Sequence, residues 1–405
     1  MGDTSVTDVD IVVIGAGPAG SAAAMTALSR GARVALIDKA RFPRHKLCGG
    51  LITGRCADHM RDVFDQGIDE PLFETRDTFQ FFMEAEHLAD LTDAPPAHLT
   101  MRWDFDHALF QRAIKAGAMD YSGRRIATLD LKAAEVTLDT ADTLTFRCLI
   151  GADGVRSCVA AALYGESFEP AKIGFALEIE ETEHPPSPDA PIRVDFAAAD
   201  WGYGWSFPKR HGTTIGVGGL HLENPDMKAR LQNYLTLLGT GAEAKVKGHF
   251  LPFGDFRNRP GEGNILLAGD AAGFVDPITG EGIGYAIQSG ALAGLAAADA
   301  VAEGVPMSAF NRYRPSTRQI RTSLRCAWLL RPLMFAKPLR PFFASAFQTS
   351  RTLKADYMAL LAGQTEYPQL LRRAALRLPN ALLRFCLRKL NLSKQSAGDK
   401  RPDPS

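Results

Sequence analysis

A glycine-rich turn near the N-terminus constrains the fold of this chain more than any other feature. The apolar, β-branched run DIVVIG at residues 10–15 leads into it, and Gly15, Gly17 and Gly20 follow the spacing G-x-G-x-x-G. An alanine-rich stretch with helical character comes next, and a second apolar run ends at Asp38. Strand, glycine turn, helix and strand in this order predict a β-α-β unit that binds a dinucleotide.

The glycines and the acid have separate physical tasks in such a unit. Gly15 makes the tight turn, Gly17 lets the backbone approach a pyrophosphate, and Gly20 lets helix and strand pack closely. The helix N-terminus offers free N–H groups and a partial positive charge to the pyrophosphate. Asp38 ends the second strand, where its carboxylate can accept the ribose hydroxyls. This unit alone leaves NAD and FAD open, and the context disfavours a glycine turn without a ligand.

Two later motifs continue the pattern. GADGVRS at residues 151–157 closes a strand with a short turn that contains Asp153 and Gly154. In a longer segment, residues 263–290, Asp270 follows an apolar run and glycines stand on both sides of Pro277. The second acid is thus expected at the end of another strand of the same sheet.

With these motifs the chain resembles a large group of flavoproteins that includes aromatic hydroxylases, flavin-dependent halogenases and geranylgeranyl reductases. The resemblance implies FAD as the cofactor, with Asp270 on the ribityl chain and residues 280–283 beside the flavin ring. Arg102 matches the arginine that helps to hold the cofactor, although an ordinary surface salt bridge is the alternative for this residue. The residues assigned to the cofactor are Gly15, Gly17, Ala19, Gly20, Asp38, Lys39, Cys48, Gly49, Arg102, Asp153, Gly154, Gly269, Asp270, Pro277, Gly280, Gly282 and Ile283.

Two segments narrow the resemblance to the geranylgeranyl reductase family. KARFPRHKLCGG ends in Cys48, Gly49 and Gly50, and it is similar to the segment that ends in Cys-Gly-Gly in these reductases. GYGWSFPK at residues 202–209 is similar to their aromatic-x-Trp-x-Phe-Pro-Lys signature. Halogenases carry a segment related to the second motif but place a different one where Cys-Gly-Gly stands here.

The aromatic segment has a strand period. Trp201, Tyr203, Trp205 and Phe207 alternate with glycines and a serine, so the rings share one face of the predicted strand. Such a wall suits an apolar chain that offers no charge to grip, and small residues behind it let another layer approach. Ordinary sheet core is the alternative explanation.

The resemblance implies an FAD-dependent reductase of isoprenoid C=C bonds that transfers hydride from flavin N5 to a geranylgeranyl-type chain. We expect Cys48, Tyr203 and Trp205 at the catalytic centre, with Tyr203, Cys48 or water as the proton source. A monooxygenase or halogenase on the same scaffold, or an electron carrier to quinone, are the alternatives. A second G-x-G-x-x-G unit is absent, so NAD(P)H is expected to visit transiently, or electrons arrive from a donor protein.

The fold expected is α/β: a Rossmann-like FAD-binding domain, an inserted antiparallel β-sheet domain for the substrate, and a helical C-terminal region. The expected boundaries are residues 1–75, 101–165 and 257–305 for the discontinuous FAD-binding domain, 76–100 and 166–256 for the β-rich domain, 306–394 for the basic helical region, and 395–405 for a flexible tail.

The charge is unevenly distributed along the chain. Residues 1–311 hold 27 Lys and Arg against 42 Asp and Glu, whereas residues 312–394 hold 17 against 2. The basic region interleaves arginines with aromatic and leucine side chains, which is typical of a segment that contacts an anionic membrane. An equally weighted alternative is that these arginines pair with the acidic body of the protein. Nucleic-acid binding is not expected, because no module for it is present.

Six scattered cysteines without a C-x-x-C pair predict neither a zinc site nor an iron–sulfur cluster. The first residues carry acids where a signal peptide would carry Lys or Arg, and the longest uncharged run, residues 282–298, is mostly Gly and Ala. We therefore expect a cytoplasmic protein without a transmembrane helix, with peripheral contact to the inner face of the membrane as an option.

Overall fold

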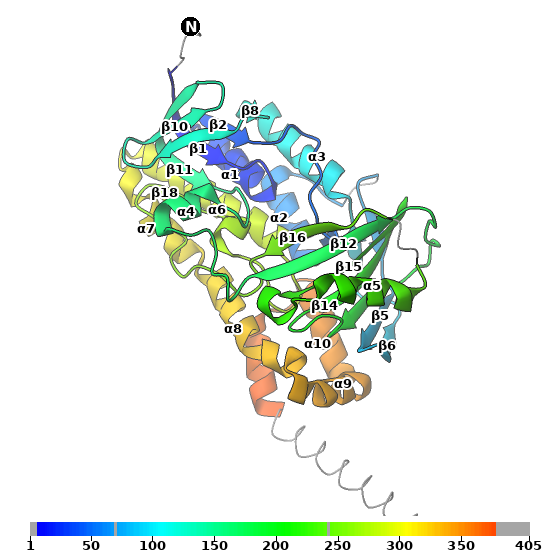
Figure 1. Ribbon diagram of the computed structural model, residues 1–405. Coiled ribbons are helices and arrows are strands. Elements are labelled where there is room, and N and C mark those ends of the chain that lie inside the picture. Colours follow the sequence, from blue (N-terminus) through cyan, green and yellow to red (C-terminus); the bar gives the residue numbers. More distant parts are fainter. Residues whose placement is uncertain (1–5, 69–70, 241–243, 378–405) are drawn as a thin grey trace, which may run out of the picture.

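The structure, a computed structural model, describes residues 6–68, 71–240 and 244–377. Figure 1 shows a nucleotide-binding domain with its sheet and helices, a second large sheet beside it, and C-terminal helices packed below the second sheet. The basic region thus lies next to the domain that is expected to bind the substrate.

The first sheet has eight strands, six of them in the order β17-β18-β11-β1-β2-β8. The pairs from β18 to β8 are parallel, whereas β17 is antiparallel to β18 and the β9–β10 hairpin extends β11. The strands are β1 (Val6–Ile14), β2 (Val34–Asp38), β8 (Met119–Ser122), β9 (Ile126–Asp130), β10 (Glu135–Leu138), β11 (Thr143–Gly151), β17 (Gly261–Glu262) and β18 (Ile265–Leu267). The predicted Rossmann-like domain is confirmed.

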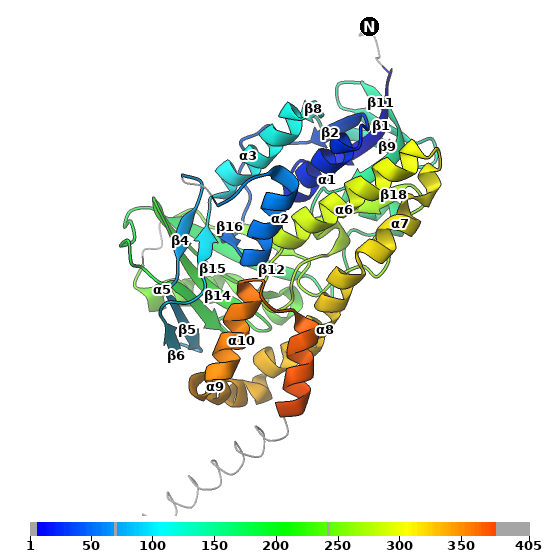
Figure 2. The same cartoon turned by 180° about the vertical axis from the view of Figure 1, so that it is seen from behind.

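Two helices of this domain, α1 (Pro18–Ser29) and α6 (Ile283–Ala302), run side by side, as Figure 2 shows. A Cβ at Gly290 would lie 2.0 Å from the Ala19 carbonyl oxygen, and one at Gly294 would lie 2.2 Å from that of Ala23. The small residues of α6 therefore allow the backbones of α1 and α6 to lie in direct contact. The other helices here are α2 (Gly54–Phe64), α3 (Arg102–Lys115) and α4 (Cys158–Tyr164).

The second sheet has seven strands in the order β16-β12-β15-β14-β13-β5-β6. They are β5 (Phe79–Met83), β6 (Glu86–Leu91), β12 (Gly174–Glu181), β13 (Ile192–Phe196), β14 (Tyr203–Lys209), β15 (Gly212–Leu220) and β16 (Lys247–Leu251). The sheet is antiparallel as predicted, except that β13 and β5 are parallel, because the β5–β6 hairpin comes from an earlier part of the chain and joins at the edge.

Residues 97–99, which the expected boundaries group with this sheet, lie outside it. They form β7 (Ala97–Leu99), which pairs with β3 (Leu51–Ile52) and β4 (Glu74–Arg76) in a separate three-stranded sheet.

Helix α5 (Met227–Leu238) packs on one face of the large sheet. A Cβ at Gly204 of this sheet would lie 2.9 Å from the ring of Tyr234 on α5. The absence of a side chain at Gly204 thus leaves the space in which α5 packs against the sheet.

The C-terminal region is helical over the residues described. It contains α7 (Ala309–Ser316), α8 (Arg318–Phe335), α9 (Arg340–Thr349), α10 (Arg351–Leu361) and a helical stretch at 367–377. The Phe347 ring lies 5.1 Å from that of Phe81, and the Phe343 ring 5.5 Å from that of Phe196. These helices therefore share a core with the second sheet. Short 3-10 helices occur at His221–Glu223, Gly269–Ala272, Pro306–Ser308 and Lys337–Leu339.

Part of the positive charge of this region pairs with the acidic body. Arg340 is buried, with its two Nη atoms 2.7 Å from Glu84 Oε1 and from Asp200 Oδ1. Lys337 Nζ lies 3.2 Å from the other oxygen of Asp200. For Arg340 and Lys337, the alternative that the basic region pairs with the acidic body is therefore correct. Residues 378–394 and the predicted tail 395–405 lie outside the described residues.

Among the described residues, no helix combines the length and the hydropathy needed to span a bilayer. The five cysteines described are all free. One group of side chains, Glu181, Glu183 and His184, has its ligand atoms close together, but Glu183 and His184 are exposed.

Candidate functional site

A cavity of about 930 Å³ lies where the nucleotide-binding domain meets the second sheet. Its lining runs from the turn after β1, past residues 46–51 and 279–283, to the rings of β14. Leu361, at the end of α10, completes it. All three parts of the chain thus contribute to one cavity.

At the nucleotide end, the cavity is lined by Gly15, Gly17 and Ala19 at the N-terminus of α1. Gly15 has φ +97°, and a Cβ there would lie 2.3 Å from the Ala152 carbonyl oxygen, so no other residue fits. The Asp38 carboxylate accepts hydrogen bonds of 2.9 Å from the N–H groups of Ala16 and Ala40. These bonds fix the carboxylate at the wall of the cavity, beside Lys39.

The central part of the cavity is lined by Asp270, Gly280, Gly282 and Ile283. Gly282 is the N-cap of α6 and no side chain caps this helix, so its first N–H groups are open to a ligand. Asp153 and Gly154 line the cavity too. Asp153 accepts hydrogen bonds from Ser157 Oγ (2.5 Å) and the Cys158 N–H (2.7 Å).

Three residues assigned to the cofactor do not line the cavity: Gly20, Gly269 and Pro277. A Cβ at Gly20 would lie 1.7 Å from the Gly15 carbonyl oxygen, so this glycine serves helix–strand packing. Gly269 donates its N–H to Ser289 Oγ at 2.9 Å, and Pro277 is buried. They shape the loops that carry the lining residues.

The lining fits FAD on its own geometry. Two helix N-termini without side-chain caps line one cavity, the glycine turn leaves room for a pyrophosphate, and Asp38 and Asp270 offer carboxylates to two sugar-like chains.

Arg102 lies in a buried ion pair at the cavity wall, so the surface salt bridge considered for it is wrong. Its Nε and Nη2 donate to the two carboxylate oxygens of Asp106 at 2.6 and 2.8 Å. Arg44 Nη1 lies 3.1 Å from the same carboxylate, and Asp106 is fully buried. Sequence reasoning missed Asp106, although the spacing of Arg102 and Asp106 on a predicted helix was a usable signal.

The Cys48-Gly49-Gly50 turn is packed against the second sheet. A Cβ at Gly49 would lie 2.8 Å from the Phe207 ring, and one at Gly50, which has φ +75°, would lie 2.0 Å from the Thr100 carbonyl oxygen. The Gly50 N–H donates to Cys48 Sγ at 3.4 Å. The two glycines therefore let the turn approach the aromatic strand.

Three of the four predicted rings, those of Tyr203, Trp205 and Phe207, line the cavity. The Trp205 ring centroid is 5.9 Å from that of Tyr203 and 6.5 Å from that of Phe207. Behind Trp205 a Cβ at Gly216 would lie 2.3 Å from the indole. Tyr203 Oη donates to the Thr279 carbonyl at 2.5 Å, and burial raises the pKa of Tyr203.

Trp201 does not belong to this wall. It precedes β14 with φ +54°, which breaks the strand alternation before Tyr203. Its ring centroid lies 5.3 Å from the Arg331 guanidinium, and its carbonyl accepts from Arg331 Nη2 at 3.2 Å. The prediction that Trp201 contacts the substrate is corrected, since this ring packs on α8 outside the cavity.

Sequence reasoning also missed several ionisable groups in or beside the cavity. Lys46 lines the cavity, and burial lowers its pKa even though Asp270 acts in the opposite direction. His249 lines it as well, and burial lowers the pKa of this imidazole to about 3, so it is neutral. Glu178, which accepts the Cys48 N–H at 3.0 Å, comes from a strand with no motif to mark it.

Comparison with known proteins agrees with this geometry. Residues 8–185 match the family described as FAD binding domain. The chain is 32% identical to a menaquinone reductase of Mycobacterium tuberculosis, covering 71% of this chain and 76% of that protein. It is 30% identical to digeranylgeranylglycerophospholipid reductase 1 of Methanopyrus kandleri (79% and 89% covered) and 32% identical to the geranylgeranyl diphosphate reductase of Rhodobacter capsulatus (73% and 77% covered).

Solved structures show the same fold. A geranylgeranyl bacteriochlorophyll reductase-like protein of Thermoplasma acidophilum superposes with a TM-score of 0.73 at 19% identity, covering 92% of this chain and 99% of that chain. The flavin-dependent brominase Bmp2 follows with a TM-score of 0.69 at 20% identity, covering 92% and 100%. The fold alone is thus shared by reductases and halogenating enzymes. The relatives at 30% identity or more decide the family: the chain belongs to the geranylgeranyl reductase family of FAD-dependent oxidoreductases.

Proposed function

We propose that this protein reduces isoprenoid C=C bonds, on a geranylgeranyl-type chain. The observation that carries the proposal is the wall of Tyr203, Trp205 and Phe207, which lines the same cavity as Cys48, Gly49 and residues 280–283. An apolar chain is bound there by shape and area, at about 0.8 kcal/mol for each buried methylene.

The residues that would hold FAD are those that line the nucleotide end and the centre of the cavity, with Gly15, Gly17, Asp38, Arg102 and Asp270 as the main contacts. When bound, FAD in its reduced form supplies the hydride. The aromatic wall orients the alkene, and the buried rings exclude water from it. Tyr203 keeps its proton at neutral pH, because burial raises its pKa and its hydroxyl is held by Thr279.

The names of the relatives support an isoprenoid or a quinone with an isoprenoid tail as the substrate class. Transient NAD(P)H or a donor protein would supply the electrons, since no second dinucleotide motif is present in the sequence. The rivals remain a monooxygenase or halogenase on this scaffold and an electron carrier to quinone.

An anaerobic incubation separates these functions. The holoenzyme is reduced with dithionite and mixed with geranylgeranyl diphosphate or with menaquinone, and the lipid is analysed by mass spectrometry. We expect a gain of hydrogen pairs in the isoprenoid chain. A parallel incubation with O2 and halide tests the rivals: insertion of oxygen or halide there, with no hydrogen gain in the anaerobic sample, would exclude the reductase, and reduction of the quinone ring alone would favour the electron carrier.

We also propose that the exposed side chains of α8, in the basic region, contact the anionic inner face of the cytoplasmic membrane. Trp328 and Leu329 on α8 are 51% and 57% exposed. Arg318 and Arg325 on the same helix are exposed too. We expect co-sedimentation with vesicles that contain phosphatidylglycerol, weakened by salt and by Trp328→Ala. Binding that ignores both salt and anionic lipid would contradict this.

A further inference from the structure

Behind the Cys48 turn lies a pair of buried ionisable side chains that the steps above do not use. Glu178 belongs to β12 and Lys209 to the end of β14, and they are only 1% and 6% exposed. Neither side chain lines the cavity itself. A carboxyl and an amine are therefore held out of water next to the Cys48-Gly49-Gly50 turn.

The contacts of Glu178 are asymmetric. One oxygen, Oε1, accepts the Cys48 N–H at 3.0 Å. The other, Oε2, is buried without a hydrogen-bond partner among the residues that the structure describes. A carboxylate with a bare buried oxygen is poorly stabilised, whereas a carboxylic acid at this oxygen needs only one acceptor.

The buried amine of Lys209 also has only a weak hydrogen-bond partner. Its Nζ donates to Met101 Sδ at 3.5 Å, and a thioether is a weak acceptor. A Cβ at Gly50 would lie 3.0 Å from Nζ, so the amine is packed directly on the Cys48-Gly49-Gly50 turn. Its electrostatic partners are Cys48 and Glu178.

The pKa shifts of Glu178 and Lys209 both favour the uncharged form of the side chain. Burial raises the pKa of Glu178 to about 7 against the opposing effect of Lys209, while Glu180 and Lys247 act on it from β12 and β16. Burial lowers the pKa of Lys209, and the charge of Arg102 on α3 lowers it further. Cys48, Glu178 and Glu180 act in the opposite direction. Glu178, with a pKa of about 7, can therefore hold or release a proton near neutral pH, beside the buried amine of Lys209.

We propose that Glu178 and Lys209 form the proton reservoir that re-protonates the Cys48 thiol, after this thiol has donated its proton to the substrate carbon. The inference rests on the proposed function. In the donation the S–H bond breaks, its electron pair stays on sulfur and a C–H bond forms, while the hydride comes from the reduced cofactor. The thiolate then takes a proton from the pair, which recovers one from solvent.

The surroundings of Cys48 suit a transient thiolate. The Gly50 N–H donates to Sγ at 3.4 Å, and the positive charge of Arg102 interacts electrostatically with Cys48. Glu178 and Lys209 act through Cys48 and do not touch the substrate, so they are positioning and proton-supplying residues. Their effect must therefore appear in the chemistry of the thiol itself.

The first test measures Cys48 without any substrate. The FAD holoenzyme is alkylated with iodoacetamide between pH 6 and 10, and the Cys48 peptide is quantified by mass spectrometry. Glu178→Gln keeps an acceptor for the Cys48 N–H but removes the negative charge, so the pH midpoint of alkylation should fall by about one unit; Lys209→Met should raise it by a similar amount.

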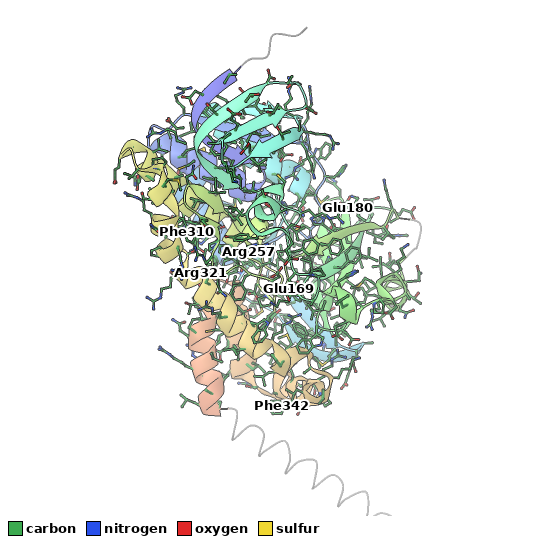
Figure 3. All side chains as sticks on the ribbon, turned by 60° about the vertical axis from the view of Figure 1, so that its left-hand side comes forward. Glu169, Glu180, Arg257, Phe310, Arg321 and Phe342 are labelled. Carbon is green, nitrogen blue, oxygen red and sulfur yellow. The ribbon has the colours of Figure 1, made fainter. Side chains whose placement is uncertain are left out.

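Glu180→Gln is the matched control. Glu180 lies two residues along β12 on the second sheet, labelled in Figure 3, and its side chain is 32% exposed and paired with Lys247 at 3.1 Å. Water screens this charge, so its removal should leave the midpoint almost unchanged. Equal midpoints in the Glu178→Gln, Lys209→Met and wild-type proteins would overturn the proposal.

The second test measures turnover. Anaerobic holoenzyme with excess dithionite receives geranylgeranyl diphosphate, and product is followed over time. Glu178→Gln should form one product equivalent at the wild-type rate and then continue about 10- to 100-fold more slowly, with KM lowered together with kcat and kcat/KM unchanged, because the slow step follows product formation. A steady rate equal to wild type, or full activity in Cys48→Ala, would overturn the reservoir and leave the proposed function standing. Alkylation midpoints that shift as expected in a protein that reduces no isoprenoid would overturn the proposed function and leave the proton pair standing.

Discussion

Trp205→Ala should reduce turnover of an isoprenoid substrate about 100-fold while FAD stays bound. The indole forms the middle of the wall that lines the cavity, and it is only 7% exposed. Without it the apolar chain loses its orientation relative to the reacting atoms. The measurement is anaerobic turnover of geranylgeranyl diphosphate, together with the flavin absorbance of the purified protein.

The same truncation also removes a large buried side chain, which costs about 3–5 kcal/mol of stability in typical cores. Trp205→Phe therefore accompanies it, because this variant keeps a ring over Gly216 and should retain the fold with an intermediate rate. Trp328→Ala, a truncation of an exposed tryptophan on α8, is the matched control and should keep wild-type turnover in detergent. Loss of flavin from Trp205→Ala and Trp205→Phe alike would mean that the rings are structural core.

Gly17→Ala should weaken FAD binding without unfolding the apoprotein. Gly17 has φ −71°, which alanine adopts freely, and the nearest protein atom to an added Cβ is Arg44 Nη2 at 3.3 Å. The methyl group would occupy the space that the pyrophosphate needs, at a cost of about 1–3 kcal/mol, or roughly 5- to 150-fold in affinity. Fluorescence titration of the apoprotein with FAD measures it.

Gly20→Ala is the contrasting variant. Its Cβ would lie 1.7 Å from the Gly15 carbonyl oxygen, so here the apoprotein itself should lose thermal stability. FAD affinity equal to wild type in Gly17→Ala would show that the cofactor does not pass over this glycine.

The features that could be predicted from the sequence are local. The glycine turn, the Asp38 strand end and the Cys-Gly-Gly segment each depend on a few consecutive residues, and the structure brings them to one cavity. Trp201 could not be separated from the wall, because its left-handed backbone and its contact with Arg331 of α8 arise from tertiary packing.

The features that were missed join distant parts of the chain. Glu178 meets Cys48 across 130 residues, and the parallel pairing of β5 with β13 unites two segments more than a hundred residues apart. The C-terminal region carried no recognisable motif, yet Leu361 completes the cavity. Such contacts follow from burial and layer packing in the assembled fold, and neither periodicity nor spacing encodes them.

Gly216 of β15 fixes the position of the Trp205 indole from behind. The ring occupies the space that a Cβ of Gly216 would need, at 2.3 Å, whereas a Cβ at Gly218, which lines the cavity, would lie at an ordinary 3.5 Å from the same ring. A methyl group at Gly216 would therefore push the indole towards the cavity and shorten the space available to a bound chain. In the proposed reductase, chain-length selectivity is thus adjustable from a position that does not line the cavity.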